Sequence, residues 1–312
     1  MILAQAPFAK PPTGTRRRAA AGSFAKCLPS GVEELRVGLK LAPQFTTVDE
    51  LRAVWRIADE AGFDHCWNFD HFASIRTDTT GDVFEAWSLL GAMAEATTRV
   101  RIGCMVTGNT YRHPGVLAKT AATVDHLSAG RLEFGLGAAW AENEHAMLGL
   151  EFGTAGQRIV RLEEACRVIK LLWTEDRASF AGEHYRLDDA IANPKPLQRP
   201  HPPIWIGGSG ERKTLRVVAL HADVWNAAGG EIDEAARLSG VLDDHCAAVG
   251  RDPAEIRRSV QIGFGGDVEE LLGRAAAFAG RGFRDLIVTV TGSEAEASAI
   301  VVAGALPRLR TL

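Results

Sequence analysis

Apolar and polar positions follow a regular rhythm along most of this chain. Short apolar runs alternate with longer segments in which apolar residues recur every three or four positions, the spacing of an amphipathic helix. In residues 48–61, for example, Leu51 and Trp55 share one helical face, and Gly62 follows as a helix-stop signal. The rhythm predicts strands at residues 36–41, 63–69, 100–106, 131–137, 204–206, 222–225, 256–263 and 285–290. It predicts helices at residues 48–61, 83–96, 114–127, 154–173, 211–220, 233–249, 268–281 and 294–302.

Strict alternation of strands and helices predicts a parallel sheet with right-handed crossovers. Eight such units fit a closed (β/α)8 TIM barrel, for which about 250 residues is typical. The alternative is a doubly wound open sheet, but residues 41–44 (LAPQ) stand where that fold usually carries a glycine-rich loop. Residues 174–202 interrupt the rhythm, and the prolines near their end exclude a helix or a central strand. We therefore expect a TIM barrel with an insertion before strand five.

The first 34 residues differ from the rest of the chain. They are rich in Ala, Pro, Gly, Lys and Arg and have no apolar period. Arginines at 16–18 and alanines at 19–21 suggest the start of a secretion signal, but no apolar stretch of sufficient length follows. We expect a disordered extension, or a translation start placed too far upstream, ahead of one domain at residues 35–312.

Composition narrows the class of protein. The net charge is -4, so the chain lacks the excess of basic residues that is typical of a nucleic-acid-binding protein. The five cysteines are scattered, which argues against a disulfide framework or a zinc site, so no metal is expected and a reducing cytoplasm is the simple expectation. No apolar run approaches the roughly 20 residues that span a bilayer.

In a TIM barrel, the residues that follow each strand form the active site. Asp70 and His71 follow the second predicted strand, and histidine can change charge near neutral pH. The alternative is a helix-capping aspartate beside a structural histidine. After the third strand, residues 105–114 form a small, polar loop that could approach a flat ligand or be an ordinary turn with a solvated Arg112.

The next two strand ends are rich in glycine. After the fourth strand, residues 135–139 leave room for a bulky planar group, and Trp140 could stack on that group or pack under a helix. Glu144 and His145 could be site residues or surface charges. After the fifth strand, residues 207–210 (GGSG) precede a predicted helix start, where free N–H groups favour a phosphate. The loop matches neither a Walker A nor a GxGxxG pattern, and a simple tight turn is the alternative.

Taken together, these segments resemble the luciferase-like monooxygenase superfamily, and within it the coenzyme F420-dependent branch. The blocks that carry the resemblance occur in the family's order, at residues 69–71, 106–119, 125–131, 135–140 with Glu144, 203–210 and 221–226. Each block alone is weak, but six at compatible spacing are specific. The resemblance covers about residues 35–310 and implies a TIM barrel with an insertion before strand five.

The resemblance also implies roles for individual residues. His71 would be catalytic, near the reactive carbon of the cofactor ring. The expected cofactor-binding residues are Asp70, Met105, Val106, Thr107, Asn109, Ala138, Ala139, Asn143, Gly207, Gly208, Ser209 and Gly210. Trp140 and Trp225 would line the substrate pocket. Family members often have a non-proline cis peptide bond after strand three, which corresponds here to Met105–Val106.

One departure from the family concerns the reaction. Members that oxidise sugar phosphates place a glutamate, the acid–base partner of the histidine, where this chain has Trp140. The expected function is therefore a coenzyme F420-dependent oxidoreductase acting on a small organic molecule, with glucose 6-phosphate a poor substrate. An FMN-dependent monooxygenase and a non-catalytic flavin-binding protein are the alternatives. A homodimer is possible.

Overall fold

The computed structural model describes residues 35–312, except residues 77 and 293. The predicted extension at residues 1–34 lies outside the described residues. None of the helices in the described part is long and apolar enough to cross a membrane.

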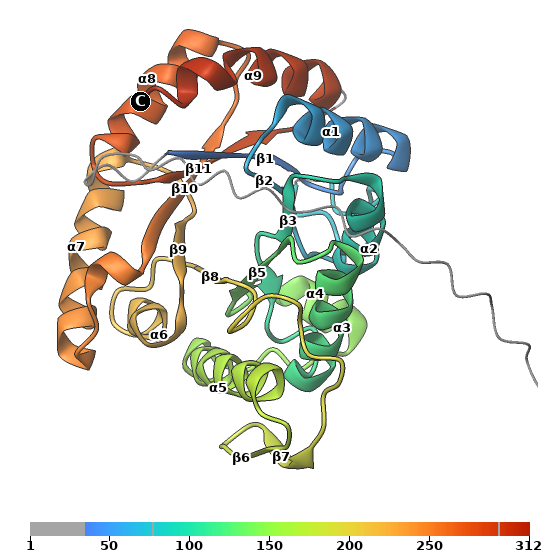
Figure 1. The fold of residues 1–312 in the computed structure, drawn as a ribbon, viewed down its shortest axis with the longest axis vertical. Coiled ribbons are helices and arrows are strands. Elements are labelled where there is room, and N and C mark those ends of the chain that lie inside the picture. Colours follow the sequence, from blue (N-terminus) through green and yellow to red (C-terminus); the bar gives the residue numbers. More distant parts are fainter. Residues whose placement is uncertain (1–34, 77, 293) are drawn as a thin grey trace, which may run out of the picture. The chain divides into compact units, whose positions relative to one another are not determined.

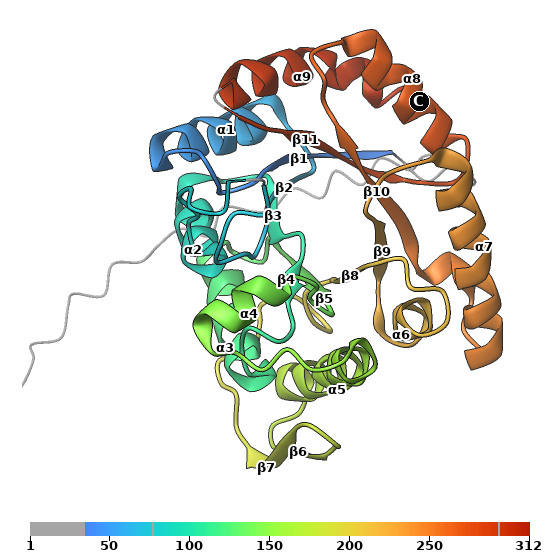
Figure 2. The same cartoon turned by 180° about the vertical axis from the view of Figure 1, so that it is seen from behind.

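Parallel strands close into a barrel in the described part of the chain, as predicted (Figure 1, Figure 2). The strands pair in ring order, and closure comes from the pairing of the third strand, β3, with the fourth, β5. The barrel strands are β1 (Arg36–Leu41), β2 (His65–Asn68), β3 (Arg101–Cys104), β5 (Leu132–Gly137), β8 (Ile204–Gly207), β9 (Val224–Ala227), β10 (Arg257–Gly263) and β11 (Asp285–Val290). A short strand, β4 (Thr107–Gly108), extends the pairing beside β5.

Helices surround the barrel (Figure 1). They bury one apolar face against the strands. The first helix begins at a capping box formed by Thr47, and at its end Gly62, the predicted stop signal, adopts a left-handed conformation. The helices are α1 (Val48–Ala61), α2 (Ala86–Ala96), α3 (Pro114–Leu127), α4 (Glu142–Leu148), α5 (Ala155–Thr174), α6 (Thr214–His221), α7 (Ile232–Val249), the 3-10 helix η1 (Pro253–Glu255), α8 (Val268–Ala279) and α9 (Ala295–Leu309).

The structure corrects several predicted boundaries. The helix expected from residue 83 begins at Ala86, because the side chain of Glu85 accepts hydrogen bonds from the first free N–H groups of α2. The helix expected from residue 211 begins at Thr214. The strand expected at 222–225 runs instead from Val224 to Ala227. Helix α4 and strand β4 were not predicted, because segments this short carry too little periodicity.

The predicted insertion contains an antiparallel hairpin of β6 (Ala178–Ala181) and β7 (Arg186–Ala190), which lies beyond α5 in Figure 1. The carboxylate of Glu164 on α5 holds its turn. It accepts hydrogen bonds from the backbone N–H groups of Glu183, His184 and Tyr185. One buried carboxylate thereby satisfies three donors and fixes the insertion to the barrel.

The alternation of β1 directs Arg36, Gly38 and Lys40 into the barrel, while the residues between them pack against the helices. Space inside is limited. A Cβ at Gly38 would lie 1.8 Å from the ring of His65, so only glycine fits beside that histidine. Large side chains fill the middle of the barrel above His65 and form a separate apolar cluster of Trp67, Met105, Trp205, Val224 and Ile287.

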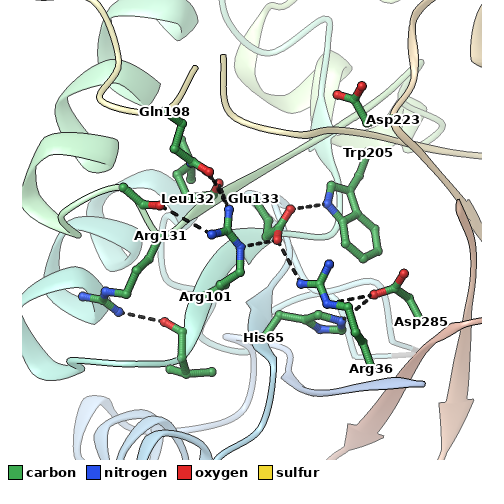
Figure 3. Close-up of polar contacts among 12 residues, drawn as sticks. Arg36, His65, Arg101, Arg131, Leu132, Glu133, Gln198, Trp205, Asp223 and Asp285 are labelled. Carbon is green, nitrogen blue, oxygen red and sulfur yellow. Dashed lines mark hydrogen bonds and ion pairs between the residues drawn. The ribbon is translucent and has the colours of Figure 1, made fainter. Parts of the chain in front are cut away.

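A polar layer crosses the barrel where the strands begin (Figure 3). We call its members, Arg36, His65, Arg101, Glu133 and Asp285, the basal polar layer. Glu133 is buried and accepts hydrogen bonds from Arg36, from Arg101 and, at 2.6 Å, from the indole N–H of Trp205. Polar groups that the barrel closes off from water are thus paired with one another.

The protonation state of His65 in this layer follows from its neighbours. The indole N–H of Trp67 lies 2.6 Å from Nδ1 of His65, and because an indole nitrogen only donates, Nδ1 must accept. Nε2 therefore holds the proton and donates to Asp285 at 3.3 Å. The positive charges that balance buried Asp285 come from Arg36 and Arg257.

We expect Asp285→Asn to lower the free energy of unfolding by about 3–5 kcal/mol, because it removes the negative charge between Arg36 and Arg257 and replaces one acceptor oxygen by an N–H donor. Burial alone would raise the pKa of Asp285, but the hydrogen bond from His65 and the two arginines hold it below the usual value. Its contribution to stability is therefore present above the usual pKa and is lost as pH falls through the lower, folded-state pKa. Chemical denaturation of wild type and variant between pH 2 and 7 measures both effects. The exposed Asp49→Asn control should change stability by less than about 0.5 kcal/mol; an equal loss in both variants would contradict the assignment.

Candidate active site

A cavity of about 440 Å³ opens where the strands end, the face on which TIM-barrel enzymes have their active sites. Its volume lies within the range of small-molecule sites, and its walls are mainly apolar. The lining residues are Lys40, Phe69, Asp70, His71, Ile75, Met105, Val106, Thr107, Gly108, Tyr111, Gly137, Ala138, Ala139, Trp140, Gly207, Gly208, Thr214, Asn226, Ala228 and Gln261. In the described residues, no group of three His, Cys, Asp or Glu side chains is arranged to hold a metal ion.

Asp70, at the end of β2, is buried in the cavity wall and paired with Arg112. The guanidinium donates two hydrogen bonds to the carboxylate, at 2.6 and 3.0 Å, and also contacts Glu85. The backbone N–H of Gly108 donates to the same carboxylate at 3.2 Å. Burial raises the pKa of Asp70, and the charge of Arg112 opposes that shift. Arg112 is therefore a fixed part of the wall and not the solvated side chain that its turn suggested.

His71 is held by a carboxylate that comes from α4. Its Nδ1 lies 2.9 Å from Oε1 of Glu144, and the other carboxylate oxygen, Oε2, accepts a hydrogen bond from the phenol of Tyr111. Burial alone would raise the pKa of Glu144, but the hydrogen bonds from His71 and Tyr111 hold it below its usual value. Burial and the neighbouring Glu144 raise the pKa of Tyr111, so the phenol keeps its proton and donates it. Trp140 supplies no carboxylate to His71, but Glu144, four residues later, does.

This arrangement selects one tautomer of His71. An ionised Glu144 only accepts, so Nδ1 of His71 must carry the proton. Nε2 of the neutral ring is then unprotonated, and none of the described residues donates to it. Because His71 lines the cavity with its side chain only 12% exposed, a molecule in the cavity would meet a free proton acceptor.

Val106 forms a ridge in the cavity, directly after the cis peptide bond Met105–Val106 that was predicted. Two glycines face this ridge. A Cβ at Gly137 would lie 2.7 Å from the Val106 side chain, and one at Gly207 would lie 3.1 Å from it. The glycines therefore allow Val106 to pack directly against β5 and β8, and the three residues form one apolar part of the cavity wall, a surface that suits a flat ring.

The loop at residues 207–210 joins the cavity to the surface. Gly207 and Gly208 line the cavity, whereas Ser209 and Gly210 are exposed. Gly208 has a φ of 133°, a conformation that side chains rarely adopt. A turn separates this loop from α6, so the N–H groups of the helix start and those of the loop are less continuous than the sequence suggested.

The sequence model of the luciferase-like monooxygenase family matches residues 32–300 of this chain. The chain belongs to the luciferase-like monooxygenase family. The resemblance inferred from six short sequence blocks is confirmed, and so is the TIM barrel that it implied.

Two relatives represent the two cofactor classes in this family. An F420-dependent glucose-6-phosphate dehydrogenase of Microbacterium testaceum (strain StLB037) is 34% identical over 231 residues, which are 73% of this chain and 67% of that protein. An FMNH2-dependent dimethylsulfone monooxygenase of Pseudomonas putida is 27% identical over 76% of this chain and 66% of that protein. The aligned segments thus span about two thirds of each relative's length.

A solved structure, that of an F420-dependent secondary alcohol dehydrogenase in complex with an F420-acetone adduct, has the same fold. Its TM-score is 0.81 over 89% of this chain and 100% of the other, although only 18% of residues are identical.

Most of the expected site residues lie together. Asp70, His71, Met105, Val106, Thr107, Ala138, Ala139, Trp140, Gly207 and Gly208 all line the cavity. Trp140 stands at the mouth, 64% exposed, with its ring centroid 5.4 Å from that of His71.

Other expected residues do not line the cavity. Trp225 is buried between the barrel and its helices, because the register of β9 turns Asn226 inward and Trp225 outward. Asn143 is exposed on α4, next to buried Glu144. Asn109 is buried, and its backbone N–H donates to the carbonyl of Gly137. Ser209 and Gly210 lie outside the cavity, as described above.

Sequence reasoning also missed residues that the structure places in the site. Lys40 and Gln261 form part of the cavity floor, and Tyr111 and Glu144 complete the histidine's surroundings. One signal was available: Lys40, like Arg36, is a charged residue at an inward position of a strand whose other residues are glycine or apolar. No sequence pattern links His71 to Glu144, because their contact depends on the tertiary fold.

We expect the imidazole of His71 to be protonated at Nδ1 near pH 7, since ionised Glu144 accepts that proton. Nitrogen-15 NMR of histidine-labelled protein, with His71→Gln used to assign the resonance, distinguishes the two ring nitrogens. In Glu144→Gln the preference for the Nδ1-protonated tautomer should weaken. A ring protonated at Nε2 in wild type would contradict the geometry.

Proposed function

We propose that this protein is a coenzyme F420-dependent oxidoreductase that interconverts a small, neutral alcohol and the corresponding carbonyl compound. The observation that carries the proposal is the pairing of His71 with Glu144 at the wall of an apolar cavity. The F420-dependent relatives and the alcohol dehydrogenase of the same fold support it.

The residues of the cavity fit a deazaflavin. The apolar wall that Val106 forms with Gly137 and Gly207 suits one face of a planar ring. Asp70 and the loop N–H groups near Gly108 would lie at its polar edge, and the loop at 207–210 would hold the phosphate of the tail. When bound, the cofactor accepts or supplies the hydride.

His71 accepts and returns the hydroxyl proton of the alcohol. In the oxidation direction, Nε2 accepts the hydroxyl proton of the alcohol while the carbon-bound hydrogen leaves as hydride. The imidazole ring of His71 then becomes a cation. The carboxylate of Glu144 stabilises this cation from the Nδ1 side, and Tyr111 keeps that carboxylate in place. In the reduction direction the same Nε2 returns the proton to the oxygen of the carbonyl compound.

The rim of the cavity favours a neutral substrate. Trp140 and Ile75 are large, exposed apolar residues there, and Arg112 is already bound to Asp70 and Glu85. Arg112 does not itself line the cavity. Among the described residues that do, the one lysine or arginine is Lys40, which lies at the floor. The rim therefore offers an apolar surface and no cluster of cations for a phosphate group.

We expect His71→Ala to lower turnover by roughly 10²–10⁴-fold, the usual scale of general acid–base catalysis, with cofactor affinity largely kept. Titration of purified wild type with F420 and with FMN, followed by steady-state assays on a series of secondary alcohols, gives both quantities. Glu144→Gln should also lower turnover and change its pH profile, because it affects His71 without removing it.

Preferred binding of FMN, with oxygen-dependent product formation, would replace this proposal by a monooxygenase. Full activity in His71→Ala would remove the histidine from the reaction. Glucose 6-phosphate should be a poor substrate, and efficient turnover of it would contradict the neutral-substrate assignment.

The phosphate position is tested best at Ser209. An aspartate at Gly208 would combine its charge with backbone strain, since a Cβ there would lie 3.0 Å from Thr214 at a φ of 133°. Ser209 is exposed, so Ser209→Asp adds the charge alone. We expect it to weaken cofactor binding at least tenfold, about 1.4 kcal/mol, while the similarly sized Ser209→Asn has little effect. Equal affinities of the two variants would place the phosphate elsewhere.

A cytoplasmic location, a homodimer and an unstructured extension remain predictions from the sequence alone.

A further inference from the structure

Lys40 is an unusual residue for the place that it occupies. It is the last inward residue of β1 and lies at the floor of the cavity, with only 9% of its surface exposed. Its ammonium group donates to the backbone carbonyl of Met105 at 3.2 Å and to the side-chain oxygen of Gln261 at 2.6 Å. Both acceptors are neutral.

The surroundings leave the charge of Lys40 uncompensated. None of the described carboxylates forms an ion pair with it, in contrast to the arginines of the basal polar layer. Burial lowers the pKa of Lys40 to about 8, which reflects the cost of a cation in this position. An ammonium group has three N–H donors, and the described residues provide two acceptors. A bound molecule in the cavity can supply the third acceptor and a negative charge.

Structural needs alone do not explain the lysine. Its floor partners already form a chain without it, since Gln261 donates to Asn226 at 2.9 Å and Asn226 donates to Ser259 at 3.0 Å. A methionine has a similar length and would fill the same space without the cost of burying a charge. The position of the charge at the cavity floor therefore points to a role in binding.

We propose that Lys40 stabilises the negative charge that the cofactor ring gains when it is reduced. This inference rests on the proposed function. In the oxidation direction, the carbon–hydrogen bond of the alcohol breaks and both of its electrons leave with the hydrogen to the ring. The hydroxyl proton goes to Nε2 of His71, so the neutral alcohol becomes a neutral carbonyl compound and the ring carries one additional negative charge. A fixed ammonium group beside the ring lowers the energy of that state, and charge near a flavin-like ring is a known means of adjusting its potential.

Binding equilibria test this role without relying on turnover. Lys40→Met removes the charge and the donor, Lys40→Gln keeps a neutral donor, and Lys170→Met is the control. Lys170 is also partly buried and its ammonium donates to a backbone carbonyl, that of His221 at 2.9 Å, but it does not line the cavity. Dissociation constants for oxidised and reduced F420 are measured anaerobically for each protein, and denaturation curves show that each variant is folded.

We expect Lys40→Met to weaken binding of the reduced cofactor at least tenfold more than binding of the oxidised cofactor. This difference corresponds to a midpoint potential lowered by about 30 mV for a two-electron couple. Lys40→Gln should show a similar change if the charge is what matters, and Lys170→Met should show none. An unchanged ratio of the two affinities in both folded Lys40 variants would overturn the proposal, as would a loss confined to the KM of the alcohol, which would assign Lys40 to the substrate.

The same measurement separates this inference from the proposed function. If wild type binds FMN and not F420, the proposed function fails, while the ratio for reduced and oxidised FMN still tests Lys40. If wild type binds neither cofactor, both proposals fail.

Discussion

The two-residue alternation of strands in a closed barrel determines which side chains reach the interior, and the rest of the structure depends on it. Closure leaves room for few inward side chains at each level, so a large one requires a small neighbour. His65 opposite Gly38 and Val106 opposite Gly137 are two examples of this pairing. Side chains fill the barrel in its middle, and a cavity remains where the strands end.

The buried polar groups at the two ends of the barrel differ in how completely they are paired within the protein. In the basal polar layer, Glu133 and Asp285 are surrounded by arginine and N–H donors, so each charge is paired within the protein. At the opposite end, Lys40 has neutral partners and His71 has one nitrogen without a donor. Charges that are fully paired within the protein stabilise the fold, whereas a donor or acceptor that is left without a partner can bind a ligand. This division follows the general separation of stability and activity between the two faces of a TIM barrel.

The periodicity of the sequence was sufficient to predict the barrel, its insertion and the face that carries the site. It was harder to predict which residues of a strand face the interior of the barrel. The family resemblance assigned Trp225 to the pocket, whereas β9 continues to Ala227 and its register turns Trp225 outward. The pairing of His71 with Glu144 joins residues 73 positions apart through a helix of seven residues, and neither short helices nor tertiary contacts leave a periodic trace in one sequence.

The carboxylate that supports His71 belongs to α4, a helix in the loop that follows a barrel strand, and not to the barrel itself. The end of β2 fixes the position of the imidazole, and the loop that contains α4 supplies the carboxylate that contacts its Nδ1. A substitution in this loop would therefore change the acid–base strength of His71 and the shape of the cavity mouth, and it would leave the barrel strands unaltered.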